Sequence, residues 1–170
     1  MSPKKTLIFS YGTLKQGFAN HSLMQDLIST NDAVFIGSYI TDLHLPLVQG
    51  PYGVPFLLNL PGSGQHRVRG ELYSVSDSGL VRLDELEGIT LGHYERLPIA
   101  LTSENGGVPA VVQAEAYYAH RSFAAEMWRK CGDVGFDAFT RELDKDYVRR
   151  DLRPKESSFR DQIRLFCSSN

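Results

Sequence analysis

Cysteine is scarce in this chain of 170 residues, which contains only Cys131 and Cys167. Two cysteines without Cys-x-x-Cys spacing cannot form a disulfide framework or a metal site by themselves, and they favour a reducing compartment. Long apolar runs are also missing, since no stretch approaches the roughly 20 residues of a membrane-spanning helix. The apolar run that follows Lys4 and Lys5 is too short for the core of a signal peptide. We therefore expect a cytoplasmic protein with no membrane partner.

An excess of charge of one sign is absent, because 18 lysines and arginines stand against 20 aspartates and glutamates, a net charge of −2. This balance gives no electrostatic reason to expect a nucleic-acid partner. Arginines do gather over residues 149–155, but acidic residues alternate with them, which indicates a solvated helix face. The five histidines are scattered singly, without the spacing of metal ligands, so we expect no metal site.

The sequence also lacks a motif that would activate a serine or cysteine as a covalent nucleophile. The sequence contains no Gly-x-Ser-x-Gly elbow. Cys131 follows Trp128 and Lys130 at an expected helix end and has no paired base, so a buried structural thiol is the better interpretation. Covalent catalysis therefore has no residue to carry it.

The chain does contain about six short segments with strand character and few helices between them. Hydrophobic residues make up 42% of the sequence and charged residues 22%, as in a globular domain of ordinary size. Branched, aromatic and alternating patterns predict strands over residues 7–11, 33–43, 54–58, 67–75, 94–101 and 108–118, with a hairpin-like loop at 103–107. This order argues against a doubly wound α/β fold and predicts an α+β fold with a mixed, partly closed sheet.

Helical periodicity predicts three regions. A short helix is expected after Asn20, a candidate N-cap, and a second begins near the cap candidates at 76–78 and ends at Gly88. Over residues 123–148 the apolar residues recur mostly at helical spacing. Residues 157–170 fit either a docked amphipathic turn or a frayed tail.

The first predicted strand ends in Tyr11, Gly12, Thr13 and Leu14. Glycine takes backbone conformations that a residue with a Cβ resists, so the amides of residues 12–14 can turn toward one point as a small anion-binding nest. The alternative interpretation is an ordinary strand exit, which these residues alone favour.

Three acidic residues, Asp84, Glu85 and Glu87, lie in the last turn of the second predicted helix. Acidic side chains near a helix C-terminus oppose the macrodipole and repel one another, so a buried member of the group has a raised pKa. A carboxyl group of that kind suits a general base near neutral pH. Glu87 is the best candidate, because Leu80 and Leu83 share its helix face. The alternative is a solvent-facing acidic turn.

Two motifs together, Phe-Ser-Tyr-Gly-Thr-Leu-Lys at residues 9–15 and Leu-Asp-Glu-Leu-Glu-Gly at residues 83–88, resemble the γ-glutamylcyclotransferase-like (AIG2-like) family. Further stretches resemble its γ-glutamylaminecyclotransferase branch: Gly17, 20–21, 46–48, 53–58, 61–64, 68–73 and 94–96. The resemblance covers about residues 6–120, expected to form the catalytic core. Residues 121–170 are expected to form a helical extension packed on that core.

The resemblance implies a γ-glutamylcyclotransferase-like α+β fold with a small mixed β-barrel and a few flanking helices. It places substrate binding at Tyr11, Gly12, Thr13 and Leu14, and it makes Glu87 the proton acceptor. In the implied reaction, the substrate's own α-amino group attacks its γ-glutamyl carbonyl and releases 5-oxoproline and a free amine. The implied enzyme needs no metal or organic cofactor. We expect it to be a monomer or a weak homodimer.

The leaving group is the open question. The resemblance favours γ-glutamyl amines as substrates, and γ-glutamyl amino acids or glutathione are the alternative. A binding or regulatory module that has lost turnover is a second alternative. Pro55 cannot donate to a strand ladder, so the Val54-Pro55 segment belongs at an edge, a bulge or a site wall. An apolar wall there cannot pair the terminal carboxylate of glutathione, which is therefore expected to be disfavoured. Tyr94 and Arg96 are candidates for supporting positions around the pocket.

Overall fold

The computed structural model describes residues 5–104, 110–132 and 134–169 of the chain. The strands are β1 (Lys5–Ser10), β2 (Ala33–Thr41), β3 (Leu47–Gln49), β4 (Pro55–Leu57), β5 (Arg69–Ser76), β6 (Tyr94–Ser103) and β7 (Val112–Ala119). The α-helices are α1 (His21–Ser29), α2 (Asp77–Leu86), α3 (Ala124–Lys130), α4 (Arg141–Asp144) and α5 (Phe159–Ser168). Short 3-10 helices are η1 (Pro51–Gly53), η2 (Ile89–Leu91) and η3 (Arg150–Leu152).

Five strands close into a barrel in the order β1-β5-β2-β6-β7, because β1 also pairs with β7. The closing contact is parallel, with Ile8 opposite Glu115, whereas the other pairs around the barrel are antiparallel. β4 extends the sheet from β7, with Leu57 opposite Tyr118, and β3 lies beyond it. The predicted α+β class and small mixed barrel are therefore confirmed.

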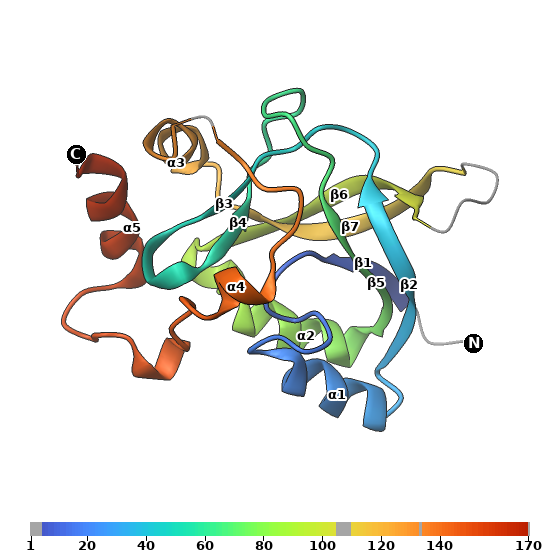
Figure 1. Ribbon diagram of the computed structural model, residues 1–170. Coiled ribbons are helices and arrows are strands. Elements are labelled where there is room, and N and C mark those ends of the chain that lie inside the picture. Colours follow the sequence, from blue (N-terminus) through green and yellow to red (C-terminus); the bar gives the residue numbers. More distant parts are fainter. Residues whose placement is uncertain (1–4, 105–109, 133, 170) are drawn as a thin grey trace.

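The side chains of β1 alternate between two apolar clusters, as the pleat of a strand requires. Ile8 is fully buried in the cluster that also holds Met24 of α1 and Leu83 of α2, whereas Phe9 belongs to the second cluster with Leu72 of β5. Helices α1 and α2 lie side by side against one side of the barrel (Figure 1). The end of β1 thus packs on α1 and α2 through one face and on the second cluster through the other, which fixes the backbone at the point where the strand exits.

Both predicted early helices are present. The side chain of Ser76 caps α2 by accepting a hydrogen bond from the backbone N–H of Gly79 at 3.1 Å. The helix stops before Gly88, whose φ of +64° lies in the left-handed region. Asn20 precedes α1, but its side chain makes no capping hydrogen bond, so that part of the prediction is wrong.

The helical prediction over residues 123–148 is only partly correct. Between α3 and α5 the described residues contain only α4 and η3 as helical segments. Residues 134–140 instead run along the sheet, where the N–H of Phe136 donates to the carbonyl of Leu47 and the N–H of Arg69 donates to the carbonyl of Asp137. Phe139 is buried because this extended segment packs against the sheet. The sequence spacing of its apolar residues resembles that of a helix, which explains the part of the prediction that is wrong.

The C-terminal residues form a docked helix, since Ile163 of α5 is buried and α5 lies beside α3 (Figure 1). The last predicted strand, over residues 108–118, begins at Val112 in the structure, and residues 108 and 109 and most of the hairpin-like loop at 103–107 lie outside the described residues. No helix in the described part of the chain is long and apolar enough to cross a membrane.

Candidate active site

A cavity of about 60 Å³, here called the inner cavity, opens where β1 ends. Its walls come from residues 8–14, from Val54 and Pro55, and from the end of α2 with Glu87. Tyrosines of β6 and β7 and side chains from residues 147–159 complete it. The four residues of the predicted binding turn and the predicted base therefore line the same cavity, although more than 70 positions separate them in the chain.

Gly12 is required here for a reason that differs from the prediction. Its φ is not in the positive range, so a left-handed conformation does not explain the glycine. A Cβ built on Gly12 would lie 2.8 Å from Cγ of Pro55, closer than real Cβ contacts. The glycine therefore allows the turn to approach the Val54-Pro55 wall, and Pro55, between β3 and β7 in the sheet, serves as a site wall and not as an edge residue.

The amides of the turn are available to a ligand. Among the described residues, the backbone N–H groups of Gly12, Thr13 and Leu14 donate to no acceptor, whereas the N–H of Lys15 donates to the carbonyl of Gly12 at 3.2 Å. Buried or half-buried amides without acceptors favour an anionic or carbonyl oxygen beside them. The arrangement suits either a substrate carboxylate or a developing oxyanion.

Tyr11 supports the turn through its hydroxyl group. The hydroxyl donates to the carbonyl of Tyr117 at 2.5 Å and accepts from the N–H of Leu57 at 3.3 Å. Burial raises the pKa of the phenol well above its usual value, so it stays protonated. Tyr11 thus connects the end of β1 to β7 and β4 through its hydroxyl group. It also lines the inner cavity.

Asn20 connects the turn to the C-terminal segment instead of capping α1. Its side-chain amide donates to Oγ1 of Thr13 and to the hydroxyl of Tyr147, both at 2.9 Å. Arg153 also donates to the Tyr147 hydroxyl, at 3.2 Å. This network holds Thr13 in place, and it leaves the hydroxyl protons of Thr13 and Tyr147 without an acceptor among the described residues.

Glu87 has the properties of a general base. It follows α2 as its C-cap residue and lines the inner cavity, where the described residues offer its carboxylate no hydrogen bond and no ion pair. The pKa of Glu87 is raised to about 8, mainly by burial; the charge of Arg150 opposes this rise, the charge of Asp84 adds to it, and Arg153 opposes it. Desolvation is thus the main cause, and the repulsion between neighbouring acids that the sequence suggested is a smaller one.

The other two acids of the turn are engaged or exposed. Asp84 accepts a hydrogen bond from the hydroxyl of Tyr117 at 2.6 Å and lies 3.1 Å from Nε of Arg96. Arg96 also pairs with Glu115 of β7 at 2.7 Å. Glu85 is exposed. Only Glu87 therefore presents a free carboxyl group to the cavity.

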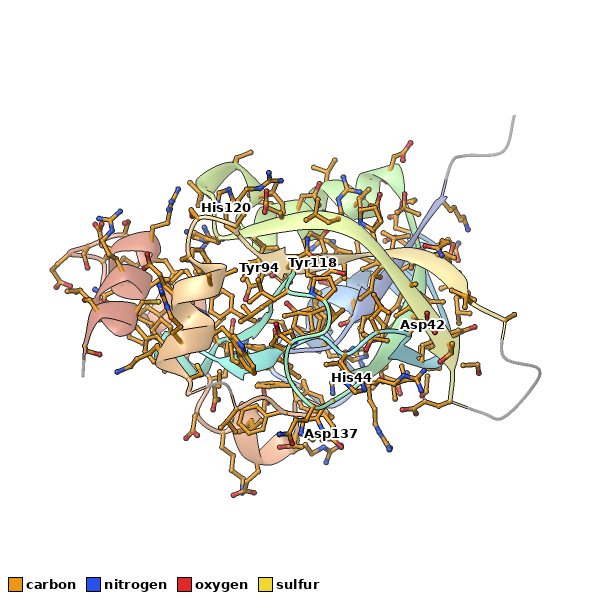
Figure 2. All side chains as sticks on the ribbon, turned by 90° about the horizontal axis from the view of Figure 1, so that it is seen from above. Asp42, His44, Tyr94, Tyr118, His120 and Asp137 are labelled. Atoms are coloured by element: carbon orange, nitrogen blue, oxygen red, sulfur yellow. The ribbon has the colours of Figure 1, made fainter. Side chains whose placement is uncertain are left out.

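Tyr94 and Arg96 differ in their relation to the cavity. Tyr94 lines it, is buried, and donates its hydroxyl to the carbonyl of Pro55 at 2.7 Å. Figure 2 shows Tyr94 among the side chains inside the molecule. Arg96 does not line the cavity. It forms an ion pair with Asp84 and so affects the cavity only through that residue.

Several lining residues have no local sequence signal. Ser10 is buried, and its hydroxyl has no hydrogen-bond partner among the described residues. His93 is buried at the edge of the cavity, and burial together with nearby arginines lowers its pKa to about 4, so the ring is neutral. Arg150 and Arg153 also line the cavity, although their segment suggested only a solvated face, and so does Phe159 from the region expected as a docked turn or a frayed tail. Alternation of charge cannot reveal that a segment folds back over a site.

The histidines do not gather as a set of metal ligands in the described part of the chain, although the backbone N–H of His120 donates to the carbonyl of His93 at 3.1 Å. Figure 2 shows His44 and His120 at separate places on the molecule. Within residues 5–104, 110–132 and 134–169, no three histidine, cysteine, aspartate or glutamate side chains are grouped as metal ligands. The expectation that no metal is needed stays a prediction.

Comparisons with known proteins identify the family of the chain. A family model described as gamma-glutamyl cyclotransferase, AIG2-like, matches residues 8–132. A protein of Arabidopsis thaliana with the provisional name gamma-glutamylcyclotransferase is 54% identical over 174 aligned residues, which cover 96% of this chain and 92% of the relative. The gamma-glutamylaminecyclotransferase of Rattus norvegicus is 39% identical over 123 residues, covering 70% of this chain and 80% of the relative.

A solved structure shares the architecture. The crystal structure of an AIG2-like protein from Mus musculus matches with a TM-score of 0.71 and 31% sequence identity, covering 91% of this chain and 99% of that one. With the family model spanning most of the sequence, the chain belongs to the gamma-glutamyl cyclotransferase, AIG2-like family.

Proposed function

We propose that this protein cyclises the γ-glutamyl group of a small substrate. The free α-amino nitrogen attacks the γ-carbonyl carbon, which forms the C–N bond of a five-membered ring. The bond between that carbon and the leaving amine then breaks. Glu87 takes the proton of the attacking amine and returns it to the leaving nitrogen, so 5-oxoproline and a free amine are released and no water is consumed.

The observation that carries the proposal is the state of Glu87. A carboxyl group with a pKa of about 8, without a hydrogen-bond partner among the described residues, is basic enough to accept a proton near neutral pH. Gly12, Thr13 and Leu14, whose amides have no acceptor among the described residues, line the same cavity. They can hold the oxyanion that forms on the γ-carbonyl or the α-carboxylate of the substrate.

The test is release of 5-oxoproline by the purified protein and by Glu87→Gln. The substitution keeps the shape of the side chain and removes its basicity, so turnover is expected to fall by roughly a hundred- to ten-thousand-fold. Glu85→Gln is the matched control, since Glu85 is the exposed acid of the same turn. Unchanged turnover in Glu87→Gln would remove the mechanism. Binding of 5-oxoproline without any turnover in the unaltered protein would favour a binding module.

The proposal also covers the substrate, the compartment, the oligomeric state and the need for a metal. The rat relative carries a name that specifies γ-glutamyl amines, and γ-glutamyl amino acids and glutathione are the alternative substrates. We place the reaction in the cytoplasm, which suits the two free cysteines, in a monomer or weak homodimer. Residues 6–120 form the proposed catalytic core and residues 121–170 its extension. Activity should survive dialysis against a chelator, since the chemistry assigned to Glu87 uses no metal.

A further inference from the structure

A second cavity of about 340 Å³, here called the outer cavity, adjoins the inner one. Four residues line both cavities: His93, Arg150, Arg153 and Phe159. The two cavities therefore meet at these four side chains, and a leaving group that extends from Glu87 past them would enter the outer cavity. The chemistry of the outer cavity then bears on which leaving groups are accepted.

The lining of the outer cavity is cationic. It contains Arg150, Arg153, Lys155 and Arg160, and no aspartate or glutamate. None of the ion pairs between described residues involves any of the four. The acidic neighbours in the chain, Asp151 and Glu156, are exposed and do not line the cavity.

The hydrogen bonds of these cations go to neutral groups. Arg150 donates to the carbonyls of Glu85 and Leu86 at 3.2 and 3.4 Å. Arg153 donates to the carbonyl of Val148 at 2.8 Å, and its guanidinium lies 4.8 Å from the ring centre of Phe159. These two guanidinium groups are thus held by neutral acceptors and have no ion-pair partner among the described residues, which favours an anionic ligand with planar oxygens.

Two of the four cations line both cavities, and the other two line only the outer cavity. Arg150 and Arg153 act electrostatically on Glu87, so part of their charge belongs to the inner cavity. Lys155 and Arg160 line only the outer cavity. All four lie beyond the residues matched by the family model, which end at 132.

We propose that the outer cavity is a carboxylate-binding subsite for the leaving amine, with Lys155 and Arg160 as its specificity residues. The proposal rests on the proposed function of the inner cavity. It selects γ-glutamyl compounds whose leaving group carries a carboxylate over those whose leaving group is a plain amine. It also reverses the expectation that the Val54-Pro55 wall disfavours a leaving group with a carboxylate, such as that of glutathione. That wall lines the inner cavity only, whereas the proposed carboxylate site is the outer cavity.

Two matched substrate pairs test the subsite. Within each pair only the carboxylate differs: γ-glutamylalanine against γ-glutamylethylamine, and ε-(γ-glutamyl)lysine against γ-glutamylcadaverine. We expect kcat/KM to be at least about tenfold higher for the carboxylate-bearing member, mainly through a lower KM, because a site built to pair a charge rejects its absence. The ratio should shrink in about 0.5 M salt, since partly exposed charges are screened.

Lys155→Gln and Arg160→Gln should each lower this ratio several-fold. Arg164→Gln is the control, because Arg164 lies on the same helix α5 but pairs with Asp161 outside both cavities. Thermal unfolding checks that each variant folds, and exposed Lys155 provides a second variant should Arg160→Gln be unstable. A ratio of one or less in the unaltered protein, or a ratio that survives both substitutions, would overturn the subsite while leaving the role of Glu87 intact. Failure to cyclise any of the four substrates would instead reject the proposed function.

Discussion

Glu87 combines burial with the lack of a partner, and that combination makes the stability of the protein depend on pH. Its pKa is raised from an ordinary 4.5 to about 8 in the native protein. Between these values the unfolded chain has released the proton while the native protein keeps it. The native state therefore binds more protons, and its stability falls as the pH rises through this window.

The first prediction compares unfolding of the unaltered protein with Glu87→Gln. The variant cannot ionise, so its stability advantage should grow from pH 4.5 to 8 and then stay constant, reaching on the order of 5 kcal/mol. Urea titrations at several pH values measure the difference. Because the pKa of His93 is lowered to about 4, its protonation destabilises both proteins below pH 6.5 and cancels in the comparison. A pH-independent difference would mean that Glu87 is not held protonated.

The second prediction concerns Asp84, whose charge helps to raise the pKa of Glu87. Asp84→Asn should move the rising limb of the kcat/KM profile to lower pH by roughly half a unit to one unit. It should also cost about 1 to 2 kcal/mol, because the Tyr117 hydroxyl and Arg96 lose a charged partner. The control is Glu95→Gln, which breaks the ion pair with Arg121 away from the cavity. An unchanged pH profile in Asp84→Asn would contradict the electrostatic coupling.

At the scale of elements, the turn after β1 packs closely against the start of β4, where Gly12 lies next to Pro55. The short distance from a hypothetical Cβ to Cγ of Pro55 makes this a contact between two segments and not a property of the turn alone. Gly12→Ala should therefore destabilise the protein by about 1 to 3 kcal/mol and raise KM, since the cavity wall must shift.

A double-mutant cycle distinguishes contact from conformation. In a Pro55→Ala background the Cγ atom is absent, so Gly12→Ala should cost at least 1 kcal/mol less, by rough estimate, than it does alone. Chemical denaturation of the four proteins measures the coupling energy. An equal cost in both backgrounds would show that the backbone of Gly12, and not its approach to Pro55, requires the glycine.

At the scale of the whole molecule, α5 closes the site from the far end of the chain. Phe159 stacks on Phe56 with ring centres 6.2 Å apart and meets the ring of His93 edge-on at 5.0 Å. Its ring lines both cavities. The helix therefore contributes to the burial that sets the electrostatics of the site.

The fourth prediction follows from this placement. Phe159→Ala should raise KM and cost about 1 to 3 kcal/mol of stability, since the ring is half-buried. It should also move the pKa of His93 upward from about 4 toward its ordinary range, because water reaches the imidazole. An NMR titration of His93 measures the shift. Phe166→Ala is the control on the same helix, since Phe166 packs on the core without lining either cavity. Equal effects of the two substitutions would argue against a closing role for Phe159.

The sequence alone was sufficient for six of the seven strands found in the described residues, with β3 missed, for the α2 cap and stop, and for the two motifs that meet in the inner cavity. These are local features: alternation of side chains, a serine before a helix and a glycine after it act within a few residues. Tertiary structure decided what depends on distant neighbours. Burial selected Glu87 over Asp84 as the free acid, the β1–β7 contact closed the barrel, and the approach of Pro55 required Gly12. Arg150 and Arg153 became cavity residues only because the chain returns to the end of β1, and a charge pattern along a segment holds no information about which surface that segment will cover.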